Sequence, residues 1–409
     1  MKSAATFQKS SLNLQPNEVA ARCAHLRDVV FFDSALESPG ALSIVAACPR
    51  EVVEGSTERD WDLLREKVRA CQRASTDDGA PHGMAAGYVE YDGCFHFGFY
   101  DDMLLFRHAD QTWMEHGKMI SLMQSLPRFG ESARPVFARE MEPEDFCRGV
   151  RRAQEYIAAG DIYQVNLSHR FSTRWSGDAW PLYESLRTYS PAPNAVFMRV
   201  GGRSVLSASP ECFLRMSGGH IRTRPIKGTR PRRRETSADE KSAFDLLTSQ
   251  KEIAELIMIT DLERNDLGQI CEYGSIETRE LLKLERYQQV FHLVSTIDGC
   301  LCREVDHVTA LQKCFPGGSI TGAPKMRARQ VIAEIEPIPR GLYTGAIGYF
   351  GFNGESQFNI AIRTLIVEER EQVAHFHVGA GIVADSVPEK EYEETLDKAA
   401  GILLAAERL

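Results

Sequence analysis

A hairpin signal in the last quarter of the chain limits its possible folds more strongly than any other feature. In YTGAIGYFGFNGESQFNIAIRTLIVEE, two β-rich arms flank Asn353-Gly354, a pair typical of tight turns between antiparallel strands. FMRVGGRSVLSASPECFLRM repeats the pattern around Gly201-Gly202. Parallel strands need long crossover connections instead. The sequence therefore predicts antiparallel sheets rather than a doubly wound parallel sheet.

The length of 409 residues suits one large or two closely packed domains. Residues 29–56 and 87–106 predict strands separated by turn residues. A stretch rich in Pro, Gly and polar residues follows at 125–137. We expect a β-rich N-terminal half at 1–135 and a second half at 142–409, the two intimately packed as one unit.

Two helices of the second half have recognisable ends. An amphipathic segment at 146–157 has Pro143 near its start and Gly160 beyond its end, residues that suit helix termini. The final helix is expected to open with Ser386 in a capping box and Pro388 in its first turn.

The charge balance argues against two classes of partner. Lys and Arg number 48 against 57 Asp and Glu, a formal charge of -9, so there is no general attraction to nucleic acid or anionic membranes. The densest basic run, 223–234, lacks interleaved aromatic residues. The sequence also lacks a secretory apolar core and any run of about twenty apolar residues. We expect a cytoplasmic protein with ten reduced, widely spaced cysteines.

Two acidic pairs lie on predicted helices. Glu252 and Glu255 are three residues apart in KEIAELIMITDLERND, and Glu391 and Glu394 repeat that spacing, which places each pair on one helix face. Two such pairs could converge on Mg²⁺, which takes one or two protein carboxylates and leaves positions for water and an anionic substrate. On spacing alone, solvated helix faces are the commoner explanation.

Two glycine-rich loops are candidate anion sites. FPGGSITGAPKMRAR at 315–329 precedes a predicted helix, where free backbone N–H groups and Lys325 could hold an oxyanion. It is not a P-loop, because the GxxxxGK[ST] order is absent. VGAGIVADS at 378–386 could let backbone amides approach a carboxylate. Either loop could instead be structural.

Ordered segments over about residues 142–405 resemble the chorismate-utilising family, which contains anthranilate synthase component I, aminodeoxychorismate synthase component I, and the isochorismate and salicylate synthases. The resembling segments are GDIYQVNLSHRF, SASPECFL, RPIKGTRPR, KEIAELIMITDLERNDLG, FHLVSTIDG, FPGGSITGAPK, RGLYTGAIGYF, NIAIRTLIV, VGAGIVADS and EKEYEETLDKA. The resemblance implies an α+β fold in which two antiparallel sheets pack face to face with helices outside. It places the site in a cleft of the second half.

The resemblance also implies a set of binding residues. Mg²⁺ would bridge protein carboxylates and the ring carboxylate of chorismate. The implied metal residues are Glu252, Glu255, Glu391 and Glu394. The implied substrate-binding residues are Thr321, Gly322, Tyr343, Arg363, Gly379, Gly381 and Lys398. An arginine among them is apt, because its guanidinium can bind a carboxylate through two hydrogen bonds.

Two positions distinguish branches of the family. Water-adding members carry a general-base lysine where this chain has Gln164, which argues against isochorismate and salicylate synthases. PIKGT, with Lys227, resembles aminodeoxychorismate synthases, whereas anthranilate synthases typically read PIAGT. The resemblance implies that Lys227 attacks C2 of chorismate as the C4 hydroxyl leaves, and that ammonia then attacks C4 and expels the lysine. A structural loop lysine is the alternative.

Two further residues match catalytic positions of the family. Glu211 would donate a proton to the departing hydroxyl, and His292 would orient or help to protonate it. A buried structural glutamate and a core histidine are the alternatives. Anthranilate synthase component I is the first alternative function, favoured by an aromatic product and pyruvate, and a non-catalytic binder of chorismate-like ligands is the second.

The expected partners are chorismate, ammonia and a glutaminase subunit. The chain has no GxCxGxQ segment with a nucleophilic cysteine, so a separate subunit or solution must supply ammonia. The N-terminal half of related proteins can hold tryptophan, and FFDSALES resembles the region involved. Whether a pocket exists here, and the oligomeric state, stay open.

Overall fold

Both predicted hairpins are present in the computed structural model. β19 (Ala346–Gly351) turns through Gly354, with φ +84°, into β20 (Glu355–Ile360). β11 (Asn194–Val200) turns through Gly201 and Gly202, with φ +63° and +82°, into β12 (Arg203–Ser209). Positive φ is readily adopted by glycine, which explains these turns.

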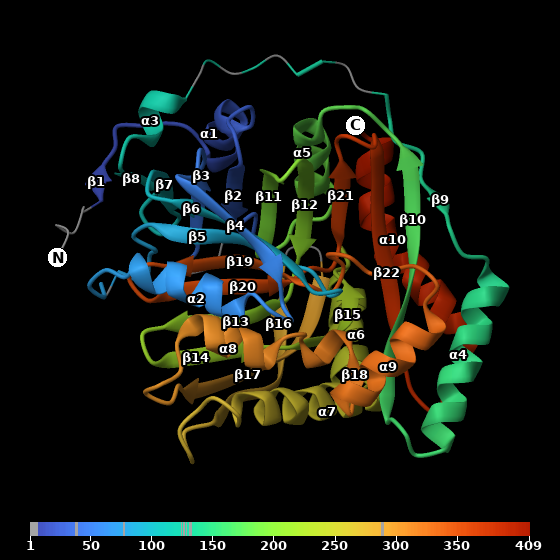
Figure 1. The fold of residues 1–409 in the computed structure, drawn as a ribbon. Coiled ribbons are helices and arrows are strands. Elements are labelled where there is room, and N and C mark those ends of the chain that lie inside the picture. Colours follow the sequence, from blue (N-terminus) through green and yellow to red (C-terminus); the bar gives the residue numbers. More distant parts are fainter. Residues whose placement is uncertain are drawn as a thin grey trace.

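The structure describes residues 7–36, 40–76, 78–123, 125, 127, 129–130, 133–287 and 290–409. Within these residues the strands form two large antiparallel sheets, as predicted (Figure 1). The first sheet has the order β1 (Gln8–Lys9), β8 (Thr112–His116), β7 (Met103–Arg107), β3 (Leu42–Ala46), β2 (Val29–Asp33), β11, β12, β21 (Thr364–Glu368), β22 (Val373–Ile382), β10 (Gln164–Arg174) and β18 (Gly322–Ala323), with β9 (Ala138–Arg139) also on β10.

The second sheet has the order β15 (Ile226–Pro231), β17 (Val290–Cys300), β14 (His220–Arg224), β13 (Cys212–Ser217), β20, β19, β5 (Met84–Val89), β6 (Cys94–Tyr100) and β4 (Glu51–Ser56), with β16 (Glu277–Arg286) also on β17. Strands from before and after residue 135 contribute to both sheets, because β2 pairs with β11 and β5 pairs with β19.

The helices are α1 (Pro16–Cys23), α2 (Trp61–Ala70), α3 (Met119–Leu122), α4 (Pro143–Ala158), α5 (Ala179–Tyr189), α6 (Thr236–Leu247), α7 (Gln250–Leu267), α8 (His307–Cys314), α9 (Lys325–Ile335) and α10 (Pro388–Glu407), with a 3₁₀ turn at Gly318–Ile320. No helix within the described ranges combines the length and the apolar character that crossing a membrane requires.

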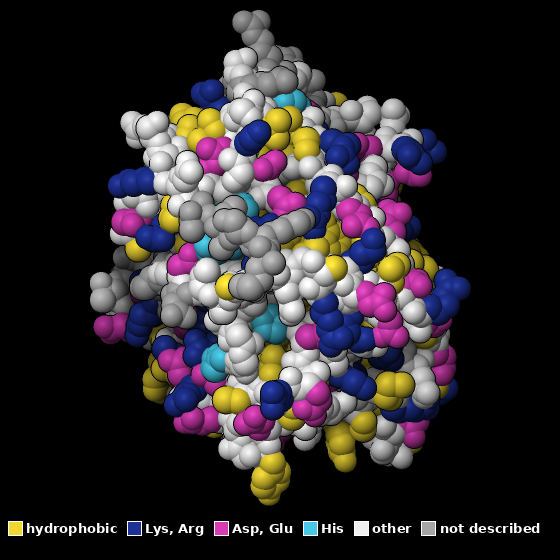
Figure 2. Space-filling view, turned by 60° about the vertical axis from the view of Figure 1, so that its left-hand side comes forward, with side chains coloured by type: hydrophobic (Ala, Val, Ile, Leu, Met, Phe, Trp, Pro, Cys, Tyr) yellow, Lys and Arg dark blue, Asp and Glu magenta, His cyan; other side chains and the backbone are white. Residues whose placement is uncertain are grey.

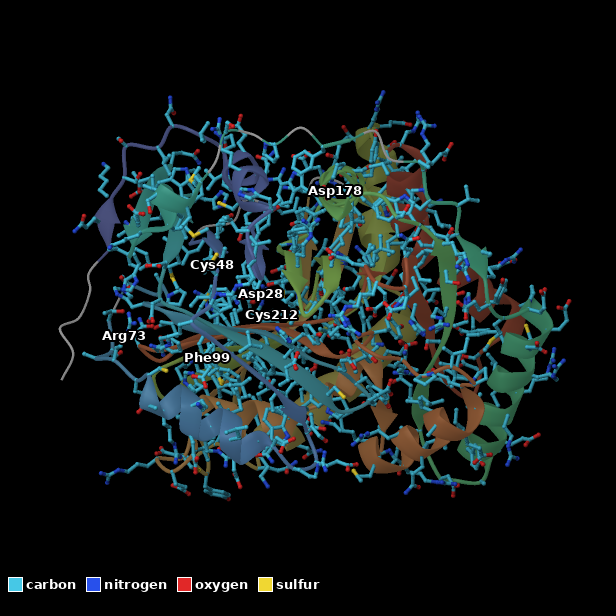
Figure 3. All side chains as sticks on the ribbon, turned by 45° about the horizontal axis from the view of Figure 1, so that its top comes forward. Asp28, Cys48, Arg73, Phe99, Asp178 and Cys212 are labelled. Atoms are coloured by element: carbon cyan, nitrogen blue, oxygen red, sulfur yellow. The ribbon has the colours of Figure 1, made fainter. Side chains whose placement is uncertain are left out.

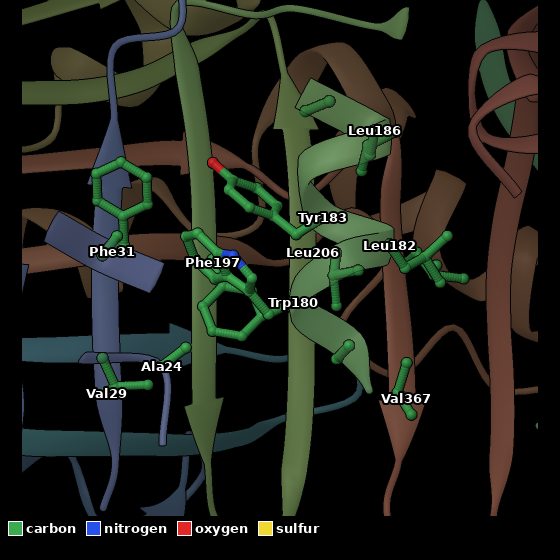
Figure 4. Packing of buried hydrophobic residues seen from close by; sticks show 14 of the residues in the cluster. Ala24, Val29, Phe31, Trp180, Leu182, Tyr183, Leu186, Phe197, Leu206 and Val367 are labelled. Atoms are coloured by element: carbon green, nitrogen blue, oxygen red, sulfur yellow. The ribbon is translucent and has the colours of Figure 1, made fainter. Parts of the chain in front are cut away.

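Apolar side chains pack between the two sheets and on the outer side of the first sheet. The two sheets pack face to face through residues such as Val196 and Val205 from one sheet and Ile347 from the other. Outside the first sheet, Trp180 and Tyr183 of α5 pack against strands β2, β11 and β12 (Figure 4). Burial of such large aromatic surfaces is a principal source of stability.

The predicted ends of α4 are confirmed, but the capping box of α10 is wrong. Pro143 is the first residue of α4, and Gly160, with φ +80°, follows its end. α10 does start at Pro388, but its N-cap is Val387. The Ser386 hydroxyl is used elsewhere, since it contacts the Val383 N–H at 3.1 Å and donates to Glu391 at 2.8 Å.

Candidate functional site

Helices α7 and α10 bring the two acidic pairs together. Lys251 on α7 places its Nζ 3.0 Å from Glu391 Oε1 on α10 and 4.0 Å from Glu255 Oε1 on its own helix. The Ser249 side chain caps α7, which fixes where the first acidic residues of that helix lie. Glu255 and Glu391 are both buried. Glu255 and Glu391 are therefore not on solvated helix faces, whereas Glu252 and Glu394 are partly exposed.

Glu255 and Glu391 each have an oxygen whose bonding capacity is unused. Among the described residues, neither Glu255 Oε1 nor Glu391 Oε2 has a hydrogen-bond partner. Burial raises the pKa of Glu255, while the ammonium groups of Lys227 and Lys251 act against that rise. Buried acceptors without partners are rare in folded proteins and commonly indicate an unseen ligand or ion.

The outer members of the two pairs have cationic neighbours. Glu252 lies 3.5 Å from Arg230 Nη1, and Glu394 lies 2.8 Å from Lys398 Nζ. Burial works to raise the pKa of Glu394, but the attraction and hydrogen bond of Lys398 outweigh it, so the pKa is lowered. Lys398 accordingly favours the charged form of Glu394.

The acidic residues suit a hard cation bound by few protein ligands. Carboxylate oxygens are the donors that Mg²⁺ prefers, and one or two commonly suffice when water and substrate complete the shell. The free oxygens of Glu255 and Glu391 meet that need from two helices. Across the described ranges, no three His, Cys, Asp or Glu side chains are grouped closely enough to enclose a metal ion. The geometry therefore fits an open site and not a closed cage.

Lys227 projects from β15 toward this acidic group. Its Nζ lies 3.8 Å from Glu255 Oε2 and donates to the Ser319 carbonyl at 3.4 Å. The pairing of β15 with β17 shifts register between Lys227 and Thr229, a bulge of the kind that redirects a side chain. Gly228 there has φ +72°, and a Cβ would meet a Leu246 methyl at 2.6 Å.

The Lys227 amine also faces the backbone of β22. A Cβ at Gly381 would lie 3.7 Å from Lys227 Nζ and 2.6 Å from Gln164 Nε2. Gln164 is buried, and its Oε1 has no hydrogen-bond partner among the described residues. The absence of a side chain at 381 thus lets the Gln164 amide and the Lys227 amine lie against the strand.

Glu211 is a buried carboxyl in the turn between β12 and β13. Burial raises its pKa, although a hydrogen bond from Ser319 and the charge of Lys227 act in the opposite direction. A carboxyl that keeps its proton at higher pH can serve as a general acid. Glu211 lies close enough to Lys227 for the two charges to interact.

His292 on β17 lies opposite Thr229, and its Nδ1 is 3.0 Å from the Thr229 hydroxyl. Burial, aided by the charge of Arg363, lowers the pKa of His292 to about 4. The imidazole is therefore neutral at neutral pH and acts as a hydrogen-bonding group there.

Tyr343, Gly379 and Lys398 come together at β22. A Cβ at Gly379 would lie 2.7 Å from the Tyr343 hydroxyl, so that hydroxyl rests against the strand. Lys398 Nζ donates to the Gly379 carbonyl at 2.8 Å. The Tyr343 ring stacks on His377 with centroids 5.3 Å apart. These contacts hold a polar wall next to the acidic helices.

Arg363 has φ +49° and no ion-pair or hydrogen-bond partner for its guanidinium in the described parts of the chain. Surrounding protein lowers its pKa. A guanidinium removed from bulk water without an acidic partner is costly, and an anionic ligand would remove that cost. This residue has the strongest individual signal for carboxylate binding.

Thr321 and Gly322 shape the loop at 315–329. The Thr321 hydroxyl donates to the Gly317 carbonyl at 2.9 Å, and a Cβ at Gly322 would come within 2.2 Å of the Gln164 carbonyl. The prediction for Lys325 is wrong, because its amine donates to Asp266 at 2.6 Å and to the Cys314 carbonyl at 3.0 Å. A buried acid fixes it inside the protein.

Three residues of the site were not predicted from the sequence. Lys251 bridges the two helices, Ser319 contacts both Lys227 and Glu211, and Glu263 is a buried carboxyl hydrogen-bonded by Thr223 at 2.6 Å. Burial, then the nearby charge of Glu211, raises the pKa of Glu263 well above its ordinary value. KEIAELIMITDLERND contains Lys251 and Glu263, but helical spacing alone does not separate them from surface charges.

Apart from this site, a cavity of about 1010 Å³ lies between the sheets, and neither Lys227 nor Glu255 lines it. Asp33, Asn194 and Tyr349 line one part of it, and Arg224 and Cys212, the latter labelled in Figure 3, line another. Part of FFDSALES therefore does border a pocket, although residues 37–39 lie outside the described residues. Figure 2 shows acidic and basic side chains interspersed on the face in view.

Residues 37–404 match the family described as chorismate binding enzyme. The chain belongs to the chorismate-binding enzyme family. This confirms the family resemblance found in the sequence. Anthranilate synthase component 1 of Synechocystis sp. is 45% identical over 281 residues, which are 67% of this chain and 55% of that protein. Aminodeoxychorismate synthase component 1 of Bacillus subtilis is 40% identical over 298 residues, which are 73% and 62% of the two chains.

Solved structures of this family share the fold. Anthranilate synthase component I from Streptococcus pneumoniae superposes with a TM-score of 0.79 at 30% identity, over 90% of this chain and 93% of that one. The menaquinone-specific isochorismate synthase MenF of Escherichia coli has a TM-score of 0.79 at 18% identity, over 98% and 93%. The predicted fold class is confirmed. The aligned part spans 55% of the length of the Synechocystis relative and 62% of that of the Bacillus relative.

Proposed function

We propose that this protein is the chorismate-aminating component of an aminodeoxychorismate synthase. With Mg²⁺ it would replace the C4 hydroxyl of chorismate by an amino group from ammonia, giving 4-amino-4-deoxychorismate for p-aminobenzoate and folate synthesis. The observation that carries the proposal is the position of Lys227. Its mostly buried amine lies near Glu255, donates to Ser319, and faces the open backbone at Gly381.

In this proposal the side chains around Lys227 divide the work of binding. Arg363 pairs with a substrate carboxylate, and the Tyr343 hydroxyl and the backbone at Gly379 and Gly381 border the same anion. Glu255 and Glu391, with Glu252 and Glu394 beside them, would hold Mg²⁺. The metal would supply positive charge against the ring carboxylate of chorismate.

The proposed chemistry consists of two displacements. After Lys227 has given a proton to solvent, its neutral amine forms a bond to C2 of chorismate as the C4–oxygen bond breaks, and the hydroxyl takes the proton of Glu211 and leaves as water. Ammonia then forms a bond to C4 while the bond from C2 to Lys227 breaks. The proton given up by the new ammonium group restores the acid form of Glu211. No pyruvate is lost in this sequence.

The raised pKa of Glu211 supports its proposed role, because the acid form must be present before the hydroxyl can leave. His292 would donate or accept a hydrogen bond as a neutral imidazole. Thr321 and Gly322 would shape the pocket through their loop.

The proposed partner is a glutaminase subunit that supplies ammonia, and we place both in the cytoplasm. Support comes from the relatives, whose names describe component 1 of a synthase. The chain would then need its partner for glutamine but not for ammonium salts.

Anthranilate synthase component I is the second candidate. The 45% identity to the Synechocystis protein of that name favours it. Lys227 argues against this function, because anthranilate synthases typically read PIAGT, with alanine at the position of Lys227.

Product analysis separates the two candidates. The purified protein is incubated with chorismate, Mg²⁺ and an ammonium salt, and the products are resolved by liquid chromatography and mass spectrometry. Aminodeoxychorismate without pyruvate is the expected result. Anthranilate with pyruvate would overturn the proposal in favour of the second candidate, and isochorismate would overturn both.

A further inference from the structure

One lysine lies between the acidic helices without a part in the proposed chemistry. Lys251 Nζ is 3.0 Å from Glu391 Oε1 and 4.0 Å from Glu255 Oε1. It therefore joins a carboxylate of α10 to a carboxylate of α7. The same two carboxylates carry the oxygens that lack hydrogen-bond partners within the described residues.

The neighbouring lysines have other contacts. Lys227 donates to the Ser319 carbonyl, and Lys398 donates to the Gly379 carbonyl. Lys398 also pairs with Glu394 at 2.8 Å, but that carboxylate lies on its own helix. Lys251 instead pairs with carboxylates of two helices and reaches water, since its side chain is 42% exposed while that of Glu391 is 4% exposed. Its charge is therefore held by the acidic site but not enclosed in it.

Two buried carboxylates in one place repel each other unless a cation lies close by. An ammonium group supplies that charge, and its flexible four-carbon stem lets it move into water when another cation arrives. A divalent ion bound to Glu255 Oε1 and Glu391 Oε2 would repel the ammonium and would compete with it for Glu255 Oε1. The two cations therefore compete for this pair of carboxylates.

We propose that Lys251 is a built-in counterion of the acidic site: it holds α7 to α10 when the site has no metal, and Mg²⁺ displaces it. This inference rests on the proposed magnesium site but not on the identity of the product. Lys251 is then a positioning residue. Its charge weakens metal binding, and in the metal-free protein it keeps α7 joined to α10.

Calorimetric titration of the full chain with MgCl₂, in the absence of chorismate, tests the competition. Lys251→Met should bind Mg²⁺ about five- to tenfold more tightly, the effect of removing one half-exposed ion pair. Lys251→Arg keeps the charge and should bind Mg²⁺ like the wild type. Lys390→Met is the matched control, because it removes the same charge from an exposed position next to Glu391.

Acetylation of the unaltered protein tests the displacement directly. With a lysine-reactive acetylating reagent and mass spectrometry of the digested protein, labelling of Lys251 should rise several-fold when MgCl₂ is added, whereas labelling of Lys390 should not change. This measurement needs no variant and no turnover.

The outcomes are distinguishable. Unchanged or weaker Mg²⁺ binding by Lys251→Met, or Lys251 labelling that does not rise with Mg²⁺, would overturn the counterion role and leave the magnesium site standing. A wild-type protein that binds no Mg²⁺ would overturn both. Neither result bears on which product is formed from chorismate, which the product analysis decides separately.

Discussion

Two lysines in the second half of the chain are equally buried but differently held. Lys325 is 14% exposed, and its amine lies 2.6 Å from Asp266 and 3.0 Å from the Cys314 carbonyl. Lys227 is 16% exposed, but its nearest carboxylate is 3.8 Å away at Glu255 and its carbonyl contact is 3.4 Å long. The first amine is locked in a complete ion pair, whereas the second has bonding capacity to spare.

The contrast extends to the acids. Burial raises the pKa of both Asp266 and Glu255, and a lysine opposes the rise in each case. Asp266 has a direct hydrogen bond from Lys325, but Glu255 Oε1 has none within the described residues. The pair of Lys325 and Asp266 is thus satisfied, whereas the pair of Lys227 and Glu255 is incomplete. Because free polar groups in an interior are costly, the incomplete pair is the one suited to a ligand.

The largest expected effect is on activity at the incomplete pair. Lys227→Ala should lower the rate of amination by at least about 10³-fold, since it removes the proposed nucleophile. The free energy of unfolding should change by less than about 1–2 kcal/mol, because Lys251 still neutralises Glu255. Product formation is measured by chromatography and stability by urea unfolding. If Lys227→Ala keeps more than a tenth of the wild-type activity, the proposed contrast between Lys227 and Lys325 is contradicted.

At the complete pair of Lys325 and Asp266, the expected effect is a loss of stability. Lys325→Met leaves Asp266 buried and unpaired, so the free energy of unfolding should fall by about 3–5 kcal/mol. Urea unfolding of this variant beside Lys227→Ala gives the comparison directly. Equal stability losses in the two variants would show that the two lysines are held alike.

A smaller effect is expected beside the Lys227 amine. In Gly381→Ala the new methyl would meet Gln164 Nε2 at 2.6 Å and narrow the space next to Lys227. We expect kcat/KM to fall roughly ten- to a hundredfold, with less than about 2 kcal/mol lost in stability. Gly219→Ala is the control, because a Cβ there meets nothing within 4 Å. Similar activity losses in both variants would contradict the account.

The smallest effect concerns the pH dependence of stability. The pKa of Glu263 is raised in the folded protein, first by burial and then by Glu211. Its contribution to stability is therefore complete below the ordinary carboxyl pKa and is lost as pH rises through the raised value. Glu263→Gln should stabilise the protein at neutral pH by about 1 kcal/mol and make its stability depend less on pH. Thermal unfolding of both proteins from pH 4 to pH 8 measures this change. An unchanged slope of stability against pH would show that Glu263 is not the cause.

The sheets and the family were predictable because their signals are local or repeated. Asn353-Gly354 specifies its own turn, and many ordered segments together identify the family. The acidic pairs were predictable in spacing but not in setting, since no local pattern states that α7 and α10 meet. Only the contact from Lys251 to Glu391 shows it, across 140 positions of sequence.

The roles of Lys227 and Lys325 could not be separated by local sequence chemistry. Each lysine closely follows a proline, Pro225 or Pro324, and each finds its partner through the tertiary fold: Asp266 lies 59 positions from Lys325. Ser386 failed as a helix cap for a related reason, because Glu391 and the Val383 N–H are better placed for its hydroxyl. A partner that is distant in sequence decides the case of Lys325, whereas competing partners close in sequence decide that of Ser386.

The central claim is that the Lys227 amine is free to react, and trapping its bond to the substrate tests that most directly. The protein is mixed with chorismate and Mg²⁺ without ammonia, quenched, digested and analysed by mass spectrometry. We predict a chorismate-derived adduct on Lys227 that is absent from Lys325 and disappears when an ammonium salt is added. Turnover to aminodeoxychorismate with no adduct on Lys227, or with an adduct on another residue, would contradict the account.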